Sequence, residues 1–156
     1  MHAKGQSEQV EWRTGDVPIS TLFDDPYFSL AGGLAETRHV FLEGNDLSNR
    51  LRDGIHVAEL GFGTGLNLIA LVIAWSAARQ PGQVRFTSFE AFPMSPDDME
   101  RAHSAFPETG SVSAELRRFW REGRRQFELF KVNVNVITGD ARSTLPAWSG
   151  RADAWF

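Results

Sequence analysis

From residue 55 onward, apolar and polar stretches alternate in the order typical of an α/β protein. An apolar run opens at Ile55 and breaks into three glycines at alternate positions, and a second apolar run follows at 66–78. The first run has the length of a buried strand, and the second has the length of a helix packed on several sides. This pattern predicts a strand, a tight loop and a helix, which together form the first unit of a parallel sheet.

Further runs repeat this order towards the C-terminus. The pattern predicts strands at 84–89, 132–137 and 152–156, helices at 97–106 and 114–127, and a short helix that ends at 145–148. Ser95 is the expected N-cap of the helix that begins at 97. Helical crossovers between such strands give a mainly parallel α/β sheet. Because the last strand is cut inside its apolar run, we expect a piece of a longer protein, with a domain that is incomplete at its C-terminal end.

Residues 1–54 read as an N-terminal extension of short strands and helices, and 55–156 as the first part of the sheet domain. The extension is expected to contain a strand hairpin at 10–13 and 17–20, a helix at 32–42 and a short helix at 47–51. The paired Asp24 and Asp25 suit a metal or an acid–base role, but with Pro26 next in sequence we favour a helix cap. We interpret His39 as a partly buried helical residue rather than as a catalytic base.

The glycine-rich turn after the first strand carries the candidate chemistry. Gly61, Gly63 and Gly65 let the backbone turn sharply and let a ligand approach the main chain without a Cβ in the way. Glu59 precedes them, and a carboxylate there would repel the pyrophosphate of a dinucleotide but attract an amine and a sulfonium. The G-x-G-x-x-G spacing of dehydrogenases also fails, because position 66 is Leu66. The motif E-x-G-x-G-x-G therefore favours S-adenosylmethionine as the cofactor, in a class I methyltransferase fold of the Rossmann-like type.

Two further acids follow the next strands. Glu90 ends the second strand, at the edge of an open α/β sheet where ligands bind, and its two oxygens suit the two ribose hydroxyls. Asp140 ends the third strand and is a candidate to accept a hydrogen bond from the adenine amino group. The alternative is that each is an ordinary surface acid at a strand end.

Composition narrows the class of protein. The 156 residues suit one domain, 42% of them are hydrophobic, and the formal net charge is −4, so attraction to nucleic acid must come from a local patch. The absence of cysteine excludes disulfides, thiolate zinc ligands and thiol nucleophiles. No apolar run is long enough to cross a membrane, and the N-terminus lacks a secretion signal. We therefore expect a cytoplasmic protein without a membrane partner, and we identify no metal site.

One dense basic patch stands out in this acidic chain. Within the helix expected at 114–127, arginines recur three or four positions apart, so that several share one side: Arg117, Arg118, Arg121, Arg124 and Arg125. Aromatic residues interleave with them, as in surfaces that bind RNA phosphates. The alternative is a solvated helix face paired with nearby acids such as Glu115, Glu122 and Glu128, and the sequence does not decide between the two.

Several segments resemble the methyltransferase domain of the bacterial MnmC family, which modifies the wobble uridine of tRNA. The resembling segments are 10–12, 16–20, 23–29, 33–41, 58–67, 87–93 and 153–156. The resemblance implies transfer of a methyl group from S-adenosylmethionine to the amine of 5-aminomethyl-2-thiouridine in tRNA. It also implies that the catalytic aspartate lies beyond Phe156, and that Tyr27, Phe28 and Arg38 border the substrate uridine.

The resemblance further implies a partner. Fused members of the family carry an FAD-dependent oxidase half, so an oxidase domain, fused or separate, is expected, whereas FAD is not expected in this chain. Two alternatives stay open: a small-molecule methyltransferase of the same fold, without RNA contacts, and a truncated module that binds the cofactor or nothing.

Overall fold

The computed structural model describes residues 10–13, 17–21, 25–27 and 33–156. Its main feature is a five-stranded sheet in the order β6-β7-β5-β4-β8. The strands are β4 (His56–Leu60), β5 (Val84–Glu90), β6 (Gln126–Leu129), β7 (Val132–Thr138) and β8 (Ala154–Trp155). All neighbours pair in parallel except β6, which runs antiparallel to β7. The expected α/β fold with a mainly parallel sheet is therefore confirmed.

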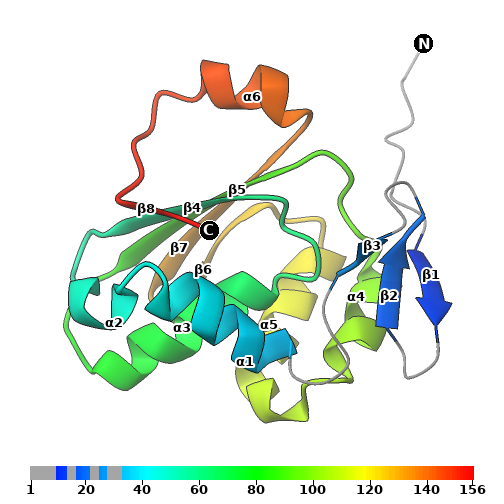
Figure 1. Ribbon diagram of the computed structural model, residues 1–156, viewed down its shortest axis with the longest axis horizontal. Helices are drawn as coiled ribbons and strands as arrows, with labels where there is room; N and C mark the ends of the chain where they lie inside the picture. Colours follow the sequence, from blue (N-terminus) through cyan, green and yellow to red (C-terminus); the bar gives the residue numbers. More distant parts are fainter. Residues whose placement is uncertain (1–9, 14–16, 22–24, 28–32) are drawn as a thin grey trace.

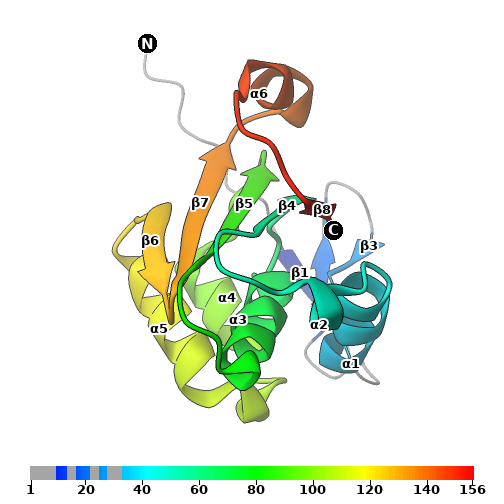
Figure 2. The same ribbon diagram turned by 90° about the vertical axis from the view of Figure 1, so that its left-hand side faces the viewer.

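Helices cover the two faces of this sheet unequally (Figures 1 and 2). In both views, most of the helices lie below the sheet and α6 lies above it. The helices are α1 (Gly33–Thr37), the π-helix η1 (Arg38–Glu43), α2 (Leu47–Arg50), α3 (Leu66–Ala78), α4 (Pro96–His103), the short 3-10 helix η2 (Pro107–Thr109), α5 (Gly110–Arg121) and α6 (Ala141–Ala147). Within the described ranges, no helix combines the length and apolar character needed to cross a bilayer.

The core forms between the sheet and α3. This helix is apolar almost all round, and Leu68, Leu71 and Val72 are fully buried on it. They pack in one cluster with strand residues such as Val57 and Phe86. Burying each such side chain stabilises the fold by about 1.5–3 kcal/mol relative to exposure. The same packing fixes the loop between β4 and α3, from which the candidate site is built.

On the opposite face, aromatic side chains fill the space between the sheet and the chain that follows α6. Trp148 makes edge-to-face contacts with Phe89 and His56, each with ring centroids 5.4 Å apart, and Trp155 stacks on Phe89 at 6.3 Å. Such pairs contribute about 0.5–1.5 kcal/mol beyond the area that they bury. They hold the segment between α6 and β8 on the sheet.

A second, smaller sheet lies beside α4 (Figure 1). It is antiparallel, in the order β1 (Val10–Arg13), β2 (Val17–Ser20) and β3 (Asp25–Pro26). The hairpin expected at 10–13 and 17–20 is confirmed, with Val10 opposite Ser20. The helix cap expected at Asp25 and Pro26 is wrong, because both residues pair with β2, and a short edge strand tolerates proline. Asp24 lies outside the described residues.

One side chain ties the small sheet to the helices under the main sheet. Trp12 Nε1 donates a hydrogen bond of 3.1 Å to Asp98 Oδ1 on α4. The Arg101 guanidinium lies 4.2 Å from the centroid of the same indole. This cation–π geometry and the hydrogen bond join β1 to α4 over a sequence separation of 86 residues.

The helix expected at 114–127 begins four residues earlier, at Gly110, and its predicted C-terminal end is also wrong. α5 stops at Arg121, Gly123 follows with φ of +75°, and Phe127 lies in β6, a strand that the pattern did not indicate. β6 turns into β7 through Phe130 and Lys131, both with positive φ, as tight strand hairpins require. Pairing with β7 stabilises β6, and this contact is invisible in the local pattern.

Two other helices also differ from expectation. The helix expected at 32–42 starts at Gly33 but continues as a π-helix from Arg38, and Gly44 N donates to His39 O, five residues earlier. The helix expected at 97–106 begins as predicted, with Ser95 Oγ accepting a hydrogen bond from Asp98 N. It ends at His103, three residues early.

Candidate cofactor site

The glycine loop between β4 and α3 is the centre of the site. Gly61, Gly63 and Gly65 have φ of +86°, +54° and +77°, a region that side chains rarely adopt. A Cβ on Gly63 would lie 3.1 Å from Tyr27 Cδ1, and one on Gly65 would lie 2.8 Å from Leu116 Cδ2. The loop therefore fits between the N-terminal segment and α5, and two of its glycines are needed for space as well as for conformation.

The ends of three strands meet at this loop. Gly61 N donates to Phe89 O over 2.8 Å, and Gly139 N donates to Glu90 O over 2.9 Å. The carboxyl ends of β4, β5 and β7 thus lie side by side, the position where α/β sheets bind ligands. The acids that the sequence singles out, Glu59, Glu90 and Asp140, are all brought to this one edge.

Glu59 is buried, with 1% of its surface exposed. Its Oε2 accepts a hydrogen bond of 2.9 Å from Asn67 Nδ2, in the first turn of α3. Among the described residues, its Oε1 and the neighbouring Ser88 Oγ have no hydrogen-bond partner. Burial raises the pKa of Glu59 to about 8, and the charge of Glu90 adds to this effect, whereas the bond from Asn67 opposes it. The site thus holds a buried carboxyl with one oxygen, Oε1, to which no described residue is hydrogen-bonded.

Glu90 already binds the glycine loop. Its Oε2 accepts hydrogen bonds from the amides of Phe62 (2.8 Å) and Gly63 (3.0 Å), and its Oε1 accepts one from Phe92 N (2.8 Å). This one carboxylate joins the loop after β4 to the loop after β5. A carboxylate has about four acceptor positions, so capacity for a ribose hydroxyl remains.

Asp140 stands at the same edge but is engaged locally. Its Oδ1 accepts from Arg142 N and so caps α6, and its carboxylate pairs with the Arg142 guanidinium at 2.6 Å. The hydrogen bond from Arg142 holds the pKa of Asp140 below its usual range. A ligand that hydrogen-bonds to Asp140 would either displace Arg142 or bind the carboxylate together with it.

A buried histidine supports the loop from the other side, and the sequence pattern gave no sign of it. His103, at the end of α4, is 3% exposed, and its Nε2 lies 2.7 Å from Thr64 O. Arg117 Nη1 lies 3.4 Å from the other ring nitrogen. Burial, together with the Arg117 charge, lowers the pKa of His103 to about 4. The ring is therefore neutral at physiological pH.

The structure describes two of the three candidate substrate residues of the N-terminal segment. Tyr27 lies against Gly63, so the structure brings it to the glycine loop. Phe28 lies outside the described residues. Arg38 begins η1 with its side chain exposed.

The arginines of the basic patch pair extensively with acids and aromatic rings. Arg118 bonds to Glu115 and Glu122, both named in advance, whereas Arg121 pairs with Asp97 at 3.0 Å and Glu100 at 2.9 Å. The third expected acid, Glu128, instead accepts from Gln83, and Arg124 and Arg125 lie over the rings of Phe119 and Trp120. The solvated, paired face thus describes Arg118 and Arg121. Exposed pairs of this kind contribute about 0–1 kcal/mol, so a phosphate can replace them.

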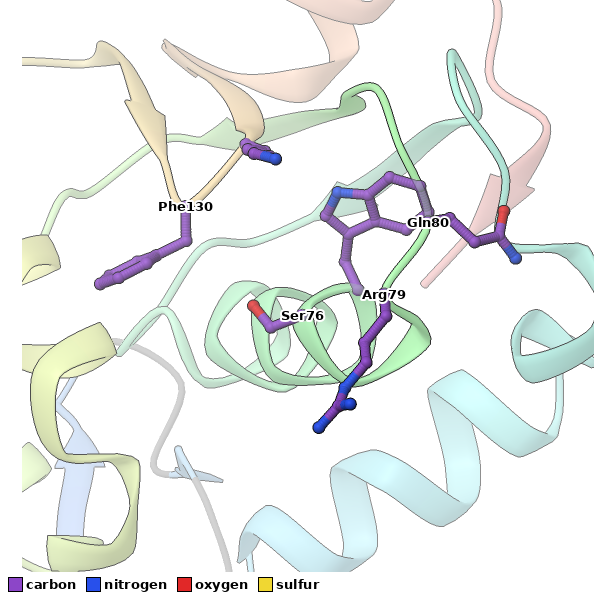
Figure 3. A pocket seen from close by; sticks show the side chains of 6 residues that line it. Ser76, Arg79, Gln80 and Phe130 are labelled. Atoms are coloured by element: carbon purple, nitrogen blue, oxygen red, sulfur yellow. The ribbon is translucent and has the colours of Figure 1, made fainter.

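A shallow pocket of about 300 Å³ lies at the opposite edge of the sheet. Figure 3 shows Ser76, Arg79 and Gln80, at and just beyond the end of α3, on one side and Phe130, from the β6–β7 turn, on the other. α3 runs from the glycine loop towards this pocket, and its 13 residues span about 20 Å. The pocket is therefore separate from the site, and none of the predicted site residues lines it.

The chain is similar in sequence to MnmC proteins of several bacteria. The tRNA 5-methylaminomethyl-2-thiouridine biosynthesis bifunctional protein MnmC of Caulobacter sp. (strain K31) is 41% identical over 93% of this chain and 26% of its own length. The MnmC proteins of Vibrio cholerae and Pseudomonas fluorescens are 36% and 38% identical over 95% of the chain, and 25% and 24% of their own. No protein-family model matches.

A solved structure shows the same fold. The crystal structure of MNMC2 from Aquifex aeolicus matches 98% of this chain and 50% of its own chain, with a TM-score of 0.70 and 21% sequence identity. The chain spans about a quarter of the length of the curated relatives that it matches. The resemblance that the motifs indicate is confirmed: along nearly its whole length, the chain is homologous to a quarter-length part of the MnmC proteins.

Proposed function

We propose that this chain is the S-adenosylmethionine-binding part of a tRNA methyltransferase. Its proposed reaction converts 5-aminomethyl-2-thiouridine to 5-methylaminomethyl-2-thiouridine at the wobble position. The main support for the proposal is Oε1 of the buried Glu59, which has no partner among the described residues and lies next to a loop whose glycines carry no side chain. A buried polar atom without a partner is costly, and a cationic, hydrogen-bonding ligand removes that cost.

The residues at the strand ends fit this cofactor by their chemistry. In this proposal the amine and sulfonium end binds at Glu59 and the glycine loop, Glu90 accepts a hydrogen bond from a ribose hydroxyl, and Asp140 accepts one from the adenine amino group. A cation beside Glu59 lowers its pKa and favours its ionised form. The three acids along the edge would thus bind the amine end, the ribose and the adenine of one nucleoside ligand.

When bound, S-adenosylmethionine supplies an electrophilic methyl group, which the substrate amine attacks in line. The protein's part is to hold the amine unprotonated, align it and exclude water. Tyr27, which lies against Gly63, is the described residue best placed to cover the loop on the substrate side. Phe28 and Arg38 are proposed neighbours of the uridine.

The proposed partner is tRNA, bound in part by Arg121 and Arg124, which are exposed near the end of α5. An FAD-dependent oxidase domain, in the same or a separate chain, is the proposed second partner, since the relatives are bifunctional proteins by name. A cytoplasmic location goes with a tRNA substrate.

A second candidate is a small-molecule methyltransferase of the same fold. The pairing of Arg118 and Arg121 with acids favours it, because paired arginines attract phosphates less. Replacing Arg121 and Arg124 by methionine separates the two candidates. If tRNA is the substrate, tRNA affinity falls and the salt dependence of binding becomes shallower by about one unit per lost phosphate contact. If tRNA binding and substrate use are unchanged, the second candidate, a small-molecule methyltransferase, is favoured.

Calorimetric titration with S-adenosylmethionine tests cofactor binding. We expect micromolar affinity for the chain and a loss of about tenfold or more for Glu90→Ala, because a hydrogen bond to a charged group contributes about 1.5–3 kcal/mol. Glu108→Ala removes an exposed acid away from the loop and is the matched control, expected to bind like the parent. Equal affinity of all three proteins would contradict the assignment of Glu90.

A further inference from the structure

Helix α5 supports the glycine loop at three successive places. Leu116 packs on Gly65, where a Cβ would lie 2.8 Å from Leu116 Cδ2. Trp120 stacks on Phe62 with centroids 4.8 Å apart and planes 14° apart. Arg117, between these two along the helix, reaches Thr64 of the loop through His103. The helix that carries the basic patch is thus also the support of the cofactor loop.

The protonation of His103 follows from its two neighbours. A carbonyl oxygen only accepts hydrogen bonds, so the ring nitrogen that faces Thr64 O at 2.7 Å, Nε2, carries the proton. In a neutral ring Nδ1 is then an acceptor, and the guanidinium of Arg117, 3.4 Å away, is a pure donor. Arg117 therefore selects the one tautomer that lets His103 donate to the loop. The low pKa of the buried ring, about 4, agrees with this neutral form.

The bond from His103 completes the anchoring of the loop backbone. The peptide between Thr64 and Gly65 is held at both ends, because its oxygen accepts from His103 and its N–H donates to Phe62 O at 2.9 Å. The preceding amides, of Phe62 and Gly63, are held by Glu90. Glycines alone would leave these peptide planes free to rotate, so the orientation of the loop depends on Glu90 and His103.

Arg117 also differs from the arginines that follow it in the basic patch. Its side chain is half-buried and directed to His103, whereas Arg121 and Arg124 are exposed. We propose that Arg117 and His103 are positioning residues for cofactor binding: Arg117 orients the imidazole, which holds the Thr64 carbonyl, and Arg117 serves the cofactor loop rather than the RNA. This assignment rests on the proposed function, since the loop is taken to bind S-adenosylmethionine.

The test measures S-adenosylmethionine affinity by calorimetry with no RNA present. His103→Phe keeps an aromatic ring but removes the donor, and we expect about tenfold weaker binding. Arg117→Met is expected to weaken binding about three- to tenfold, and Arg117→Lys, which keeps a donor and a charge, is expected to restore most of the loss. Arg118→Met is the matched control on the same helix: it removes an exposed arginine that pairs with Glu115 and Glu122, and it is expected to bind like the parent.

A double variant shows whether Arg117 acts through His103. If it does, His103→Phe with Arg117→Met binds no more weakly than His103→Phe alone, because the two residues form one chain of contacts. Additive losses would contradict the link between them. An unchanged affinity of Arg117→Met combined with weaker RNA binding would overturn the proposal and make Arg117 an RNA contact.

A measurement without cofactor separates this proposal from the proposed function. In nitrogen-15 spectra of the imidazoles, His103 should show a single tautomer with the proton on Nε2, and Arg117→Met should shift this ring towards a mixture. If the parent protein shows this signature yet binds no S-adenosylmethionine, the proposed function fails and the positioning of the loop stands. A proton on Nδ1 in the parent overturns the positioning role whatever the cofactor result. If His103→Phe does not fold, the cofactor affinity and the imidazole spectrum of Arg117→Met test the proposal instead.

Discussion

Glu59 carries an ionisable group in an environment that disfavours its charge. One oxygen bonds to Asn67, the other has no partner in the described part of the chain, and burial raises the pKa to about 8. In the folded protein at pH 7 the carboxyl is therefore mostly protonated. A cationic ligand beside it reverses the balance and drives the proton off.

Cofactor binding should consequently release a proton from Glu59. At pH 7, the heat of binding S-adenosylmethionine is expected to depend on the ionisation enthalpy of the buffer, with close to one proton released by the parent relative to Glu59→Gln. The glutamine variant keeps an acceptor for Asn67 and controls for the proton on the ligand's own amine. If both proteins release the same number of protons on binding, the cationic group of the ligand does not bind beside Glu59.

The stability of the free protein should respond to the same group. The pKa of Glu59 is higher in the folded state than the usual 4.5, so the folded protein binds more protons and stability falls as pH rises. The loss begins near pH 4.5, ends near pH 8 and has a slope of at most about 1.4 kcal/mol per pH unit.

Urea denaturation at several pH values measures this slope. Glu59→Gln should lack this contribution and gain on the parent towards pH 8. If the two stability curves run parallel, the carboxyl is not the titrating group.

Residue-level prediction from the sequence succeeded where the chemistry is local. The spacing of Glu59 and the glycines predicted a ligand site at the carboxyl edge of the sheet. The position of Glu90 after the next strand predicted that Glu90 lies at the same edge. It missed His103, because this residue meets Thr64 across 39 positions and nothing in its own neighbourhood marks it. It also missed that Glu90 would bind the loop amides, a contact that depends on the final path of the backbone.

At the scale of elements, the glycine loop has two kinds of constraint that substitution can separate. Gly61 needs only a positive φ, since a Cβ there meets nothing within 4 Å, whereas Gly65 needs both the φ and the space beside Leu116. Gly61→Ala should cost about 1–2 kcal/mol of stability from backbone strain alone.

Gly65→Ala should cost clearly more than Gly61→Ala, because the Cβ also meets Leu116 and Phe62. In a Leu116→Ala background, Gly65→Ala should cost less than it does in the parent, because the clash with Leu116 is gone. Urea denaturation of the single variants and of the double variant measures the costs. Equal losses for the two single variants would show that α5 does not press on the loop.

Prediction of the elements failed where a partner, rather than the local pattern, decides the structure. α3 was predictable because its apolar character is continuous, and its bounds match the apolar run at 66–78. The region after Arg121 was not, because Phe127 follows Trp120 by seven residues, a spacing that also suits a helix face. Pairing with β7 makes it β6.

At the scale of the whole molecule, the N-terminal segment and the main sheet meet at the site. Trp12 fastens the small sheet to α4, and Tyr27 from the same segment contacts Gly63. The division at residue 54 into an extension and a sheet domain stays a prediction. The contacts nevertheless make the first segment part of the environment of the loop.

Weakening the Trp12 contact should therefore lower the stability of both segments that it joins, the small sheet and the start of α4. Trp12→Phe removes the hydrogen bond to Asp98 and is expected to cost about 1 kcal/mol of stability. Amide hydrogen exchange should increase in β1, β2 and the first turn of α4, and leave β5 and β7 unchanged. Uniform exchange changes across the chain would instead mean that the small sheet and the main sheet open together.

The central claim is that S-adenosylmethionine binds at the carboxyl edge of the sheet. The most direct test is to follow backbone amide signals while the cofactor is added. The largest changes should fall on residues 61–65, on Glu90 and on Asp140, with little change at Arg79 and Phe130 of the opposite pocket. Changes confined to the opposite pocket, or none at saturating cofactor, would contradict the account.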